Sequence, residues 1–242
     1  MMKEALLGPF FLLQGVRQLW GKSIKRFLLI PIAINLVLFS LLIVFGFRAM
    51  HHLSHHLPHY LHWLSSVFEV LFFLISTAVL VYFFSMITNF IGAPFNSLLS
   101  SKMEQLTVGK KPFSEDSFRD IIKDLPRFFK RERDKIFYYI PRALLLLVLF
   151  FIPVINVIAG LMWILFNSWM MAIQYLDYPM DNHKMTFQHT QQFLREHRFI
   201  CFTFGISVLV AAMIPIVNLI IMPAAVIGAT HLYLFLTRSE RE

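Results

Sequence analysis

Residues 151–158 read FIPVINVI and residues 213–220 read MIPIVNLI, and these two segments decide the predicted fold. In both, a proline is followed three residues later by an asparagine, giving the pairs Pro153 with Asn156 and Pro215 with Asn218. Proline removes a backbone donor and kinks or breaks a helix. At membrane depth, non-helical backbone is tolerated only where protein or water surrounds it. The repeated pattern therefore predicts two helical hairpins whose tips carry a proline and a polar amide.

Four long stretches contain no Asp, Glu, Lys or Arg: Phe27–Phe47, Val70–Ser101, Ala143–Leu176 and Phe199–Thr237. The first two are long enough to cross a bilayer, which takes about 20 helical residues. In the third, Pro153 leaves a short first arm, and such arms are more often re-entrant than spanning. We therefore predict an all-α integral membrane protein with two long transmembrane helices and two Pro-broken, partly membrane-penetrating helical hairpins. Two pairs of ordinary spanning helices joined by tight loops are the alternative.

The composition indicates the same class of protein. Of the 242 residues, 57% are hydrophobic and 15% are charged, whereas soluble domains average about 45–50% apolar and about 25% charged residues. The single cysteine, Cys201, excludes an intramolecular disulfide and a cysteine-based metal site. We expect one membrane domain over 1–242, made of an interfacial N-terminal helix at 1–26, a span at 27–47, a span with an extension at 63–101, a basic amphipathic cytoplasmic region at 102–142, a hairpin at 143–176, a cytoplasmic loop at 177–198 and a hairpin at 199–237.

The distribution of positive charge predicts the orientation. Residues 102–142 hold 11 of the 22 Lys and Arg residues, whereas residues 48–69 hold one, Arg48. Because cytoplasmic loops carry the excess of Lys and Arg, we expect the termini and residues 102–142 on the cytoplasmic side. Within that region apolar residues recur at helical spacing, and Pro126 is expected to kink or end the helix.

Six histidines occur in the stretch HHLSHHLPHYLHW at residues 51–63. His51 with His55, and His52 with His56, have the i, i+4 spacing that can chelate a metal on a helix. Pro58 would interrupt such a helix, and no carboxylate lies in the stretch to orient an imidazole. An exposed interfacial loop is therefore favoured, and no metal site is predicted.

The enzymatic alternatives are weak. No Gly-rich phosphate loop, HExxH motif or GxSxG motif occurs. Asp177, Asp181 and His183 could form an acid–base set, but their setting, YLDYPMDNHK, is typical of a loop cap that follows a helix. We therefore predict no catalytic residues, no cofactor and no enzymatic activity.

Two groups of residues are candidates for handling an anion. At the start of the first span, Ser23 can cap the helix, while Lys25 and Arg26 add donors near its unpaired backbone N–H groups. Helix N-termini bind oxyanions through this combination, although a positive-inside anchor explains the same charges. Amides within apolar runs can line an aqueous path or join helices. The candidate pore-lining residues are Asn89, Asn96, Asn156, Asn218 and Arg127.

Several longer pieces of sequence resemble the CysZ-type sulfate permeases of bacterial sulfur assimilation. The most specific is AIQYLDYPMDNHK at 172–184, accompanied by KRFLLIPIAINL (25–36), FFSMITNFIGAPFN (83–96), KDLPRFFKRE (123–132), YIPRALLL (139–146) and MIPIVNLIIMPAAVIGAT (213–230). The resemblance covers nearly the whole chain. It implies sulfate uptake across the bacterial inner (cytoplasmic) membrane by a multi-pass homo-oligomer, dependent on the proton gradient and supplying sulfur for cysteine synthesis.

The family's anion site lies in a Gly-x-Arg-like motif before the first long helix, which matches Ser23, Ile24, Lys25 and Arg26 here. Ser23 replaces the usual glycine and Lys25 replaces an arginine, so backbone donation survives but a bidentate arginine contact at position 25 does not. The implied partners are sulfate, with sulfite or other oxyanions as further candidates, membrane lipid and further copies of the chain, and no nucleic acid. The alternatives are a non-transporting membrane scaffold that binds a partner or anionic lipid through residues 102–142, and a metal permease that uses the histidine stretch.

Overall fold

In a computed structural model, the chain divides into two units, Met1–Phe27 with Pro94–Glu242, and Leu28–Ala93. The residues that the structure describes are 7–19, 21, 33, 37, 40, 41, 43–46, 48, 70, 71, 74, 94–109, 118–153 and 155–239. Every described residue of the unit Leu28–Ala93 is helical. Most of the two predicted long spans, at 27–47 and 63–101, lies outside the described residues.

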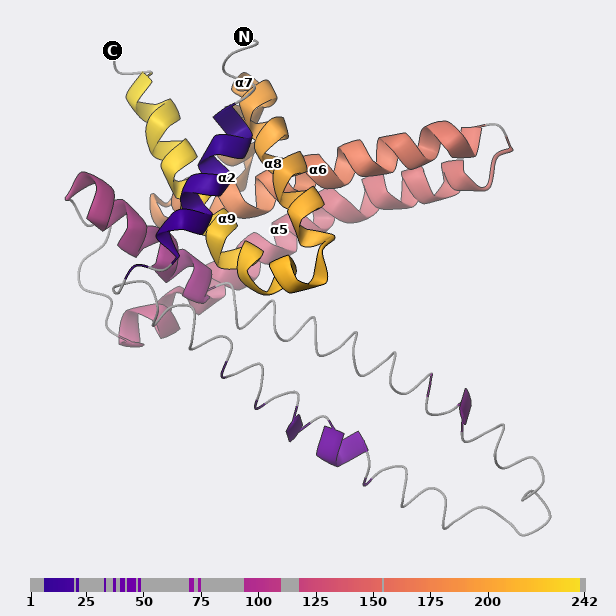
Figure 1. The fold of residues 1–242 in the computed structure, drawn as a ribbon, viewed down its shortest axis with the longest axis horizontal. Helices are drawn as coiled ribbons and strands as arrows, with labels where there is room; N and C mark the ends of the chain where they lie inside the picture. Colours follow the sequence, from indigo (N-terminus) through magenta and orange to yellow (C-terminus); the bar gives the residue numbers. More distant parts are fainter. Residues whose placement is uncertain are drawn as a thin grey trace. The chain divides into compact units, whose positions relative to one another are not determined.

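Helices make up all the regular structure of the described residues in the larger unit (Figure 1). In chain order they are α2 (Leu7–Gln18), a helix at 94–108, α5 (Phe118–Phe150), α6 (Ile155–Asn182), α7 (Phe187–Glu196), α8 (Arg198–Ala212) and α9 (Pro215–Ser239). The turn that contains Pro153 joins α5 to α6, and α9 begins at Pro215, directly after the turn from α8. The prediction of two helical hairpins that turn at these prolines is confirmed, as is the all-α fold class.

Helix α5 crosses a boundary that we expected at residue 142. Residues 118–142 of the basic region and the first arm of the hairpin belong to one helix of 33 residues, Phe118–Phe150. Pro126 and Pro141 lie inside this helix, so Pro126 does not end it. A proline removes one hydrogen bond of the ladder, and α5 continues through both prolines and packs against α6. Charged residues occur on α5 as far as Arg142, and the remaining residues, 143–150, are apolar.

The segment 177–198, expected as a loop, is mostly helical. Helix α6 continues through Asn182, so Asp177 and Asp181 lie in its last turns rather than in a loop cap. The chain then turns at Lys184, whose φ is 56°. Helix α7 follows Thr186, whose Oγ1 accepts a hydrogen bond from the backbone N–H of His189 at 3.2 Å. The expected loop was wrong because, as described below, cations from α5 compensate the two carboxylates within the helix.

Helix α2 packs against α8 and α9 in the larger unit, as Figure 1 shows. Glycines permit a close approach of the helix backbones. A Cβ at Gly15 would lie 2.0 Å from the carbonyl oxygen of Ala224, and one at Gly228 would lie 2.6 Å from the carbonyl oxygen of Phe11. The predicted N-terminal helix is therefore present, and part of it is built into the protein core, where Phe11 is buried.

The end of α5 and the start of α6 form an exposed apolar finger, residues 143–165, which extends beyond the neighbouring helices in Figure 1. At its tip Phe151 and Val157 are each 79% exposed. Among the described residues, two segments are long and apolar enough to cross a bilayer, Ile155–Asn182 and Ile220–Arg238. Within the apolar 18-residue part of each segment, 17% and 72%, respectively, is buried inside the protein. The finger therefore needs lipid or another protein chain to cover it.

Candidate functional site

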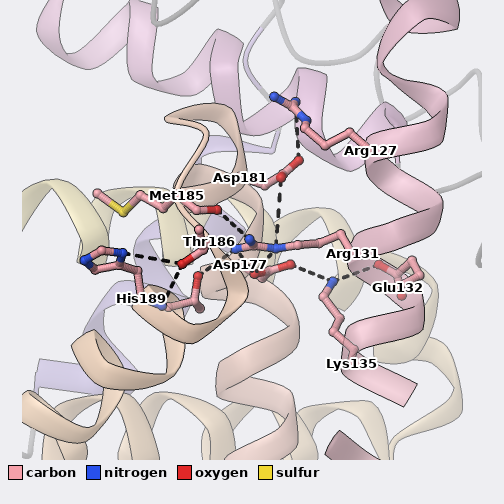
Figure 2. A network of polar contacts seen from close by, with 10 residues as sticks. Arg127, Arg131, Glu132, Lys135, Asp177, Asp181, Met185, Thr186 and His189 are labelled. Carbon is pink, nitrogen blue, oxygen red and sulfur yellow. Dashed lines mark hydrogen bonds and ion pairs between the residues drawn. The ribbon is translucent and has the colours of Figure 1, made fainter. Parts of the chain in front are cut away.

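A buried ion network joins α5 to the last turns of α6 (Figure 2). Arg131 on α5 donates from Nε and Nη2 to the same oxygen, Oδ1 of Asp177 on α6, at 2.8 and 2.5 Å. Asp177 is 1% exposed and Arg131 is 7% exposed. A buried carboxylate is unfavourable unless charges and hydrogen bonds compensate it. This contact therefore fixes the position of α5 on α6.

Lys135 completes the surroundings of the Asp177 carboxylate. Its Nζ lies 2.9 Å from Oδ2 of Asp177 and 2.8 Å from Oε1 of Glu132. Burial by itself lowers the pKa of Lys135, but the carboxylates of Asp177 and Glu132 raise this pKa above its ordinary value. The ammonium group is therefore charged at physiological pH, and Asp177 lies between two cations from consecutive turns of α5.

A second carboxylate, Asp181, lies one helical turn after Asp177. Its Oδ2 is 3.4 Å from Nη2 of Arg127, and its Oδ1 is 4.0 Å from Nε of Arg131. The spacing in the sequence explains this match. Arg127, Arg131 and Lys135 recur every four residues on α5, as Asp177 and Asp181 do on α6. Residues four apart share one face of a helix, so a cationic row on α5 meets an acidic row on α6.

Arg131 also contacts the chain beyond α6. Its Nη1 donates to the backbone carbonyl of Met185 at 2.5 Å, and its Nη2 donates to Oγ1 of Thr190 on α7 at 2.7 Å. The guanidinium carbon lies 5.7 Å from the centroid of the Phe187 ring. One buried arginine thus positions α5, α6 and α7 relative to one another, as Figure 2 shows around its centre.

An open pocket of about 740 Å³ lies beside this network, between α5 and residues 181–191. Five of its lining residues are cationic: Arg127, Lys130, Arg131, Arg142 and Lys184. Two are acidic, Asp134 and Asp181, so the lining has an excess of three positive charges. We call this the basic pocket. A concave surface with this excess of positive charge attracts anions.

The helix at 94–108 lays a polar face against α6 and α9. Nδ2 of Asn96 donates to the hydroxyl of Tyr178 at 3.2 Å, and Oγ of Ser97 donates to Oδ1 of Asn182 at 2.5 Å. Further pairs on the same face, at 2.9 and 2.8 Å, are Ser100 with Thr230 and Glu104 with His183. Because most of these groups are buried and hydrogen-bonded, the helix supports the end of α6 at a fixed position.

The structure places the predicted site residues in different surroundings. Arg127 lines the basic pocket, Asn96 is buried against Tyr178, and Asn156 is exposed just beyond the tip of the first hairpin. Asn218 lies in α9, and its side chain is outside the described part of the chain. The remaining predicted residues lie outside the described residues altogether: Asn89, the motif Ser23, Ile24, Lys25 and Arg26, and the histidines of 51–62. In the part of the chain that the structure describes, no group of three or more His, Cys, Asp or Glu could hold a metal ion.

The ion network was missed in the sequence, although its signal was present. From the sequence alone, Asp177 and Asp181 are interpreted as a loop cap, and Arg131 and Lys135 only as part of a basic region. The four-residue spacing on both segments could have revealed two complementary helix faces. Arg131 lies in the stretch 123–132 and Asp177 in the stretch 172–184, so two of the pieces that carry the family resemblance meet in this contact.

Comparison with known proteins decides the family. Residues 11–223 match the family described as sulfate transporter CysZ/etoposide-induced protein 2.4. The chain belongs to this family. It is similar to proteins named sulfate transporter CysZ from Pseudomonas paraeruginosa (42% identical), Pectobacterium atrosepticum (40%) and Salmonella paratyphi A (39%). These alignments cover 98, 93 and 96% of this chain and 97, 84 and 94% of those proteins, respectively. The resemblance drawn from the sequence is therefore confirmed, and the protein is an all-α membrane protein.

Proposed function

We propose that the protein takes up sulfate across the bacterial inner membrane. The observation that carries this proposal is similarity along nearly the whole chain to bacterial proteins named sulfate transporters, at 39–42% identity. We include in the proposal the dependence on the proton gradient and the supply of sulfur for cysteine synthesis that the family resemblance implies. We assign the protein no catalytic reaction.

The chain's chemistry supports passage of an anion rather than of a cation. Its formal net charge is +8, and a net positive charge raises the local concentration of anions. Because sulfate is strongly hydrated, its path must replace water with hydrogen-bond donors without holding the ion tightly. We assign its capture to the backbone N–H groups near Ser23 and Ile24 with the side chains of Lys25 and Arg26. We assign its passage to neutral amides such as Asn156.

We place the apolar finger in the bilayer, with the charged end of α5 at the cytoplasmic surface. Beyond Arg142 the α5 arm has eight residues, 143–150, and extends about 12 Å, less than half of the hydrocarbon thickness of about 30 Å. A finger of this reach supports partial penetration and the completion of the path by further copies of the chain. In this arrangement the protein is a multi-pass homo-oligomer with cytoplasmic termini.

Deletion of the gene from its host tests the physiological role. We expect the deletion strain to grow poorly on limiting sulfate, to recover when the chain is supplied from a plasmid, and to grow normally when cysteine is provided. Normal growth of the deletion strain on limiting sulfate would instead favour a non-transporting membrane scaffold.

Calorimetry tests the proposed capture site. Lys25→Ala combined with Arg26→Ala should weaken sulfate binding by about tenfold or more, because two charges leave the helix N-terminus. The matched control, Arg195→Ala combined with Arg238→Ala, removes the same charge from exposed positions that do not line the basic pocket. Unchanged affinity in the first variant would exclude this site.

A further inference from the structure

The basic pocket lies where the surface of α5 changes from charged to apolar. Arg127, Lys130 and Arg131 line one part of it, and Phe137 and Tyr138 line another. Arg142, the last charged residue of α5, also belongs to the lining, and the apolar finger begins at the next residue. If the finger enters lipid, the pocket lies at the level of the lipid headgroups.

Two cations of the pocket form no ion pair with any carboxylate among the described residues. These are Lys130, which is exposed, and Arg142, whose Nη1 donates to the backbone carbonyl of Tyr138 at 2.7 Å. The guanidinium carbon of Arg142 also lies 3.7 Å from the centroid of the Tyr138 ring, which holds the side chain against the helix. By contrast, Asp177 compensates the charge of Arg131. Lys130 and Arg142 therefore have charge available for a ligand.

An exposed apolar stripe leaves the pocket along α5. It starts at Phe137, which lines the pocket and is 69% exposed, and continues through Pro141, Leu145 and Val148, which are also exposed. These residues are spaced three and four apart, so they lie on one face of the helix. A ligand with a charged end and a long apolar part would be matched along its whole length by the pocket and this stripe.

The size of the pocket also favours a ligand larger than a tetrahedral ion. Pockets of about 300–1,000 Å³ hold small organic molecules, and the basic pocket, at about 740 Å³, lies within that range. A bare sulfate or phosphate ion would fill only a small part of it. A glycerol phosphodiester headgroup fits both the volume and the charge.

We propose that the basic pocket binds the headgroup of an anionic phospholipid. Lys130 and Arg142 contact the phosphate, and an acyl chain lies along the stripe from Phe137 to Val148. Basic pockets beside membrane helices on the cytoplasmic side bind anionic headgroups in this way. The bound lipid fixes the depth of the apolar finger. The inference goes beyond sulfate uptake and holds whether or not sulfate crosses the protein.

Native mass spectrometry of the full-length protein in detergent tests this proposal. The protein is mixed with equal amounts of phosphatidylglycerol and phosphatidylcholine, which differ in charge. We expect preferential retention of phosphatidylglycerol, and about 30-fold weaker retention in Lys130→Gln combined with Arg142→Gln. The control, Arg195→Gln combined with Arg238→Gln, removes the same charge outside the pocket and should retain the lipid. Equal retention of phosphatidylglycerol by the two variants would overturn the proposal.

Competition distinguishes a lipid headgroup from a free oxyanion. Millimolar sulfate should displace phosphatidylglycerol no better than sodium chloride at matched ionic strength, because sulfate lacks the acyl contact. Leu145→Gln combined with Val148→Gln should weaken lipid retention for the same reason. Selective displacement by sulfate, or full retention in this second variant, would contradict a lipid site. Sulfate uptake by the same variants is a separate measurement, so the two proposals can fail independently.

Discussion

Arg131 donates two hydrogen bonds to a single carboxylate oxygen of Asp177, although the two residues lie 46 positions apart in the chain. Both side chains are buried, and Lys135 occupies the other carboxylate oxygen. This relationship fixes the long α5 helix against the end of α6, and thereby positions the basic pocket and the base of the apolar finger.

Asp177→Asn should strongly destabilise the protein. The change removes the negative charge that compensates Arg131 and Lys135, and breaking a buried ion pair from one side costs about 3–5 kcal/mol. Asp134→Asn is the control, because among the described residues Asp134 pairs only with exposed Arg133, at 3.1 Å, and such surface pairs contribute about 0–1 kcal/mol. Unfolding in detergent, followed by circular dichroism, measures both free energies. Equal stability of the two variants would show that the network does not hold α5.

The two helical glycines Gly205 and Gly160 should respond in opposite directions to alanine. A Cβ at Gly205 would lie 2.0 Å from the carbonyl oxygen of Ser168, whereas a Cβ at Gly160 meets nothing within 4 Å. Gly205→Ala should therefore force α8 away from α6 and lower the unfolding temperature. Gly160→Ala should be neutral or stabilise by up to about 1 kcal/mol, since alanine favours the helix. The close packing of α8 on α6 would be contradicted if Gly205→Ala were the more stable of the two.

Asn96→Ala and Asn156→Ala separate a structural amide from an exposed one. Loss of the hydrogen bond from buried Asn96 should cost about 1–3 kcal/mol, because the hydroxyl of Tyr178 loses a donor. Asn156 is exposed, so its loss should leave unfolding unchanged within about 0.5 kcal/mol. Uptake assays then report on the path itself. Normal sulfate uptake in Asn156→Ala would remove this residue from the proposed path.

The contribution of Lys135 to stability should persist into mildly alkaline solution. Its pKa is raised in the folded protein, so its stabilising effect is complete below the unfolded pKa of about 10.4 and is lost only as the pH rises through the folded value. Lys135→Met should therefore lower the unfolding temperature by the same amount at neutral pH and at a pH of about 9. A difference between wild type and variant that vanished by the higher pH would contradict the buried contact with Asp177.

Local patterns in the sequence were sufficient to predict the hairpins. Pro153 and Pro215 break the backbone hydrogen-bond ladder, and the lack of charged residues around them indicates contact with lipid. Both effects act on each segment independently of the rest of the fold. Pro126 does not end α5 as the sequence suggested, because a proline removes only one hydrogen bond of the ladder and the helix continues on both sides of it. The boundary expected at residue 142 failed for a related reason, since the change from charged to apolar surface occurs within one helix.

The ion network required knowledge of which helices pack together. The carboxylates of Asp177 and Asp181 follow an apolar run, and without the cationic row of α5 opposite them they are typical of a solvated helix end. Asn96 shows the same limit, because an amide in an apolar stretch can line water or satisfy a buried hydroxyl, and the partner, Tyr178, is 82 residues away. Periodicity defines helix faces, but the pairing of faces is a property of the fold.

Transport by the purified protein in proteoliposomes tests the central proposal most directly. Radiolabelled sulfate should enter vesicles that contain the protein faster than protein-free vesicles, more so with an inward proton gradient, and unlabelled sulfate should compete. Sodium chloride at matched ionic strength should not compete. Sulfate entry no faster than in protein-free vesicles, at every pH and gradient, would contradict the proposed function.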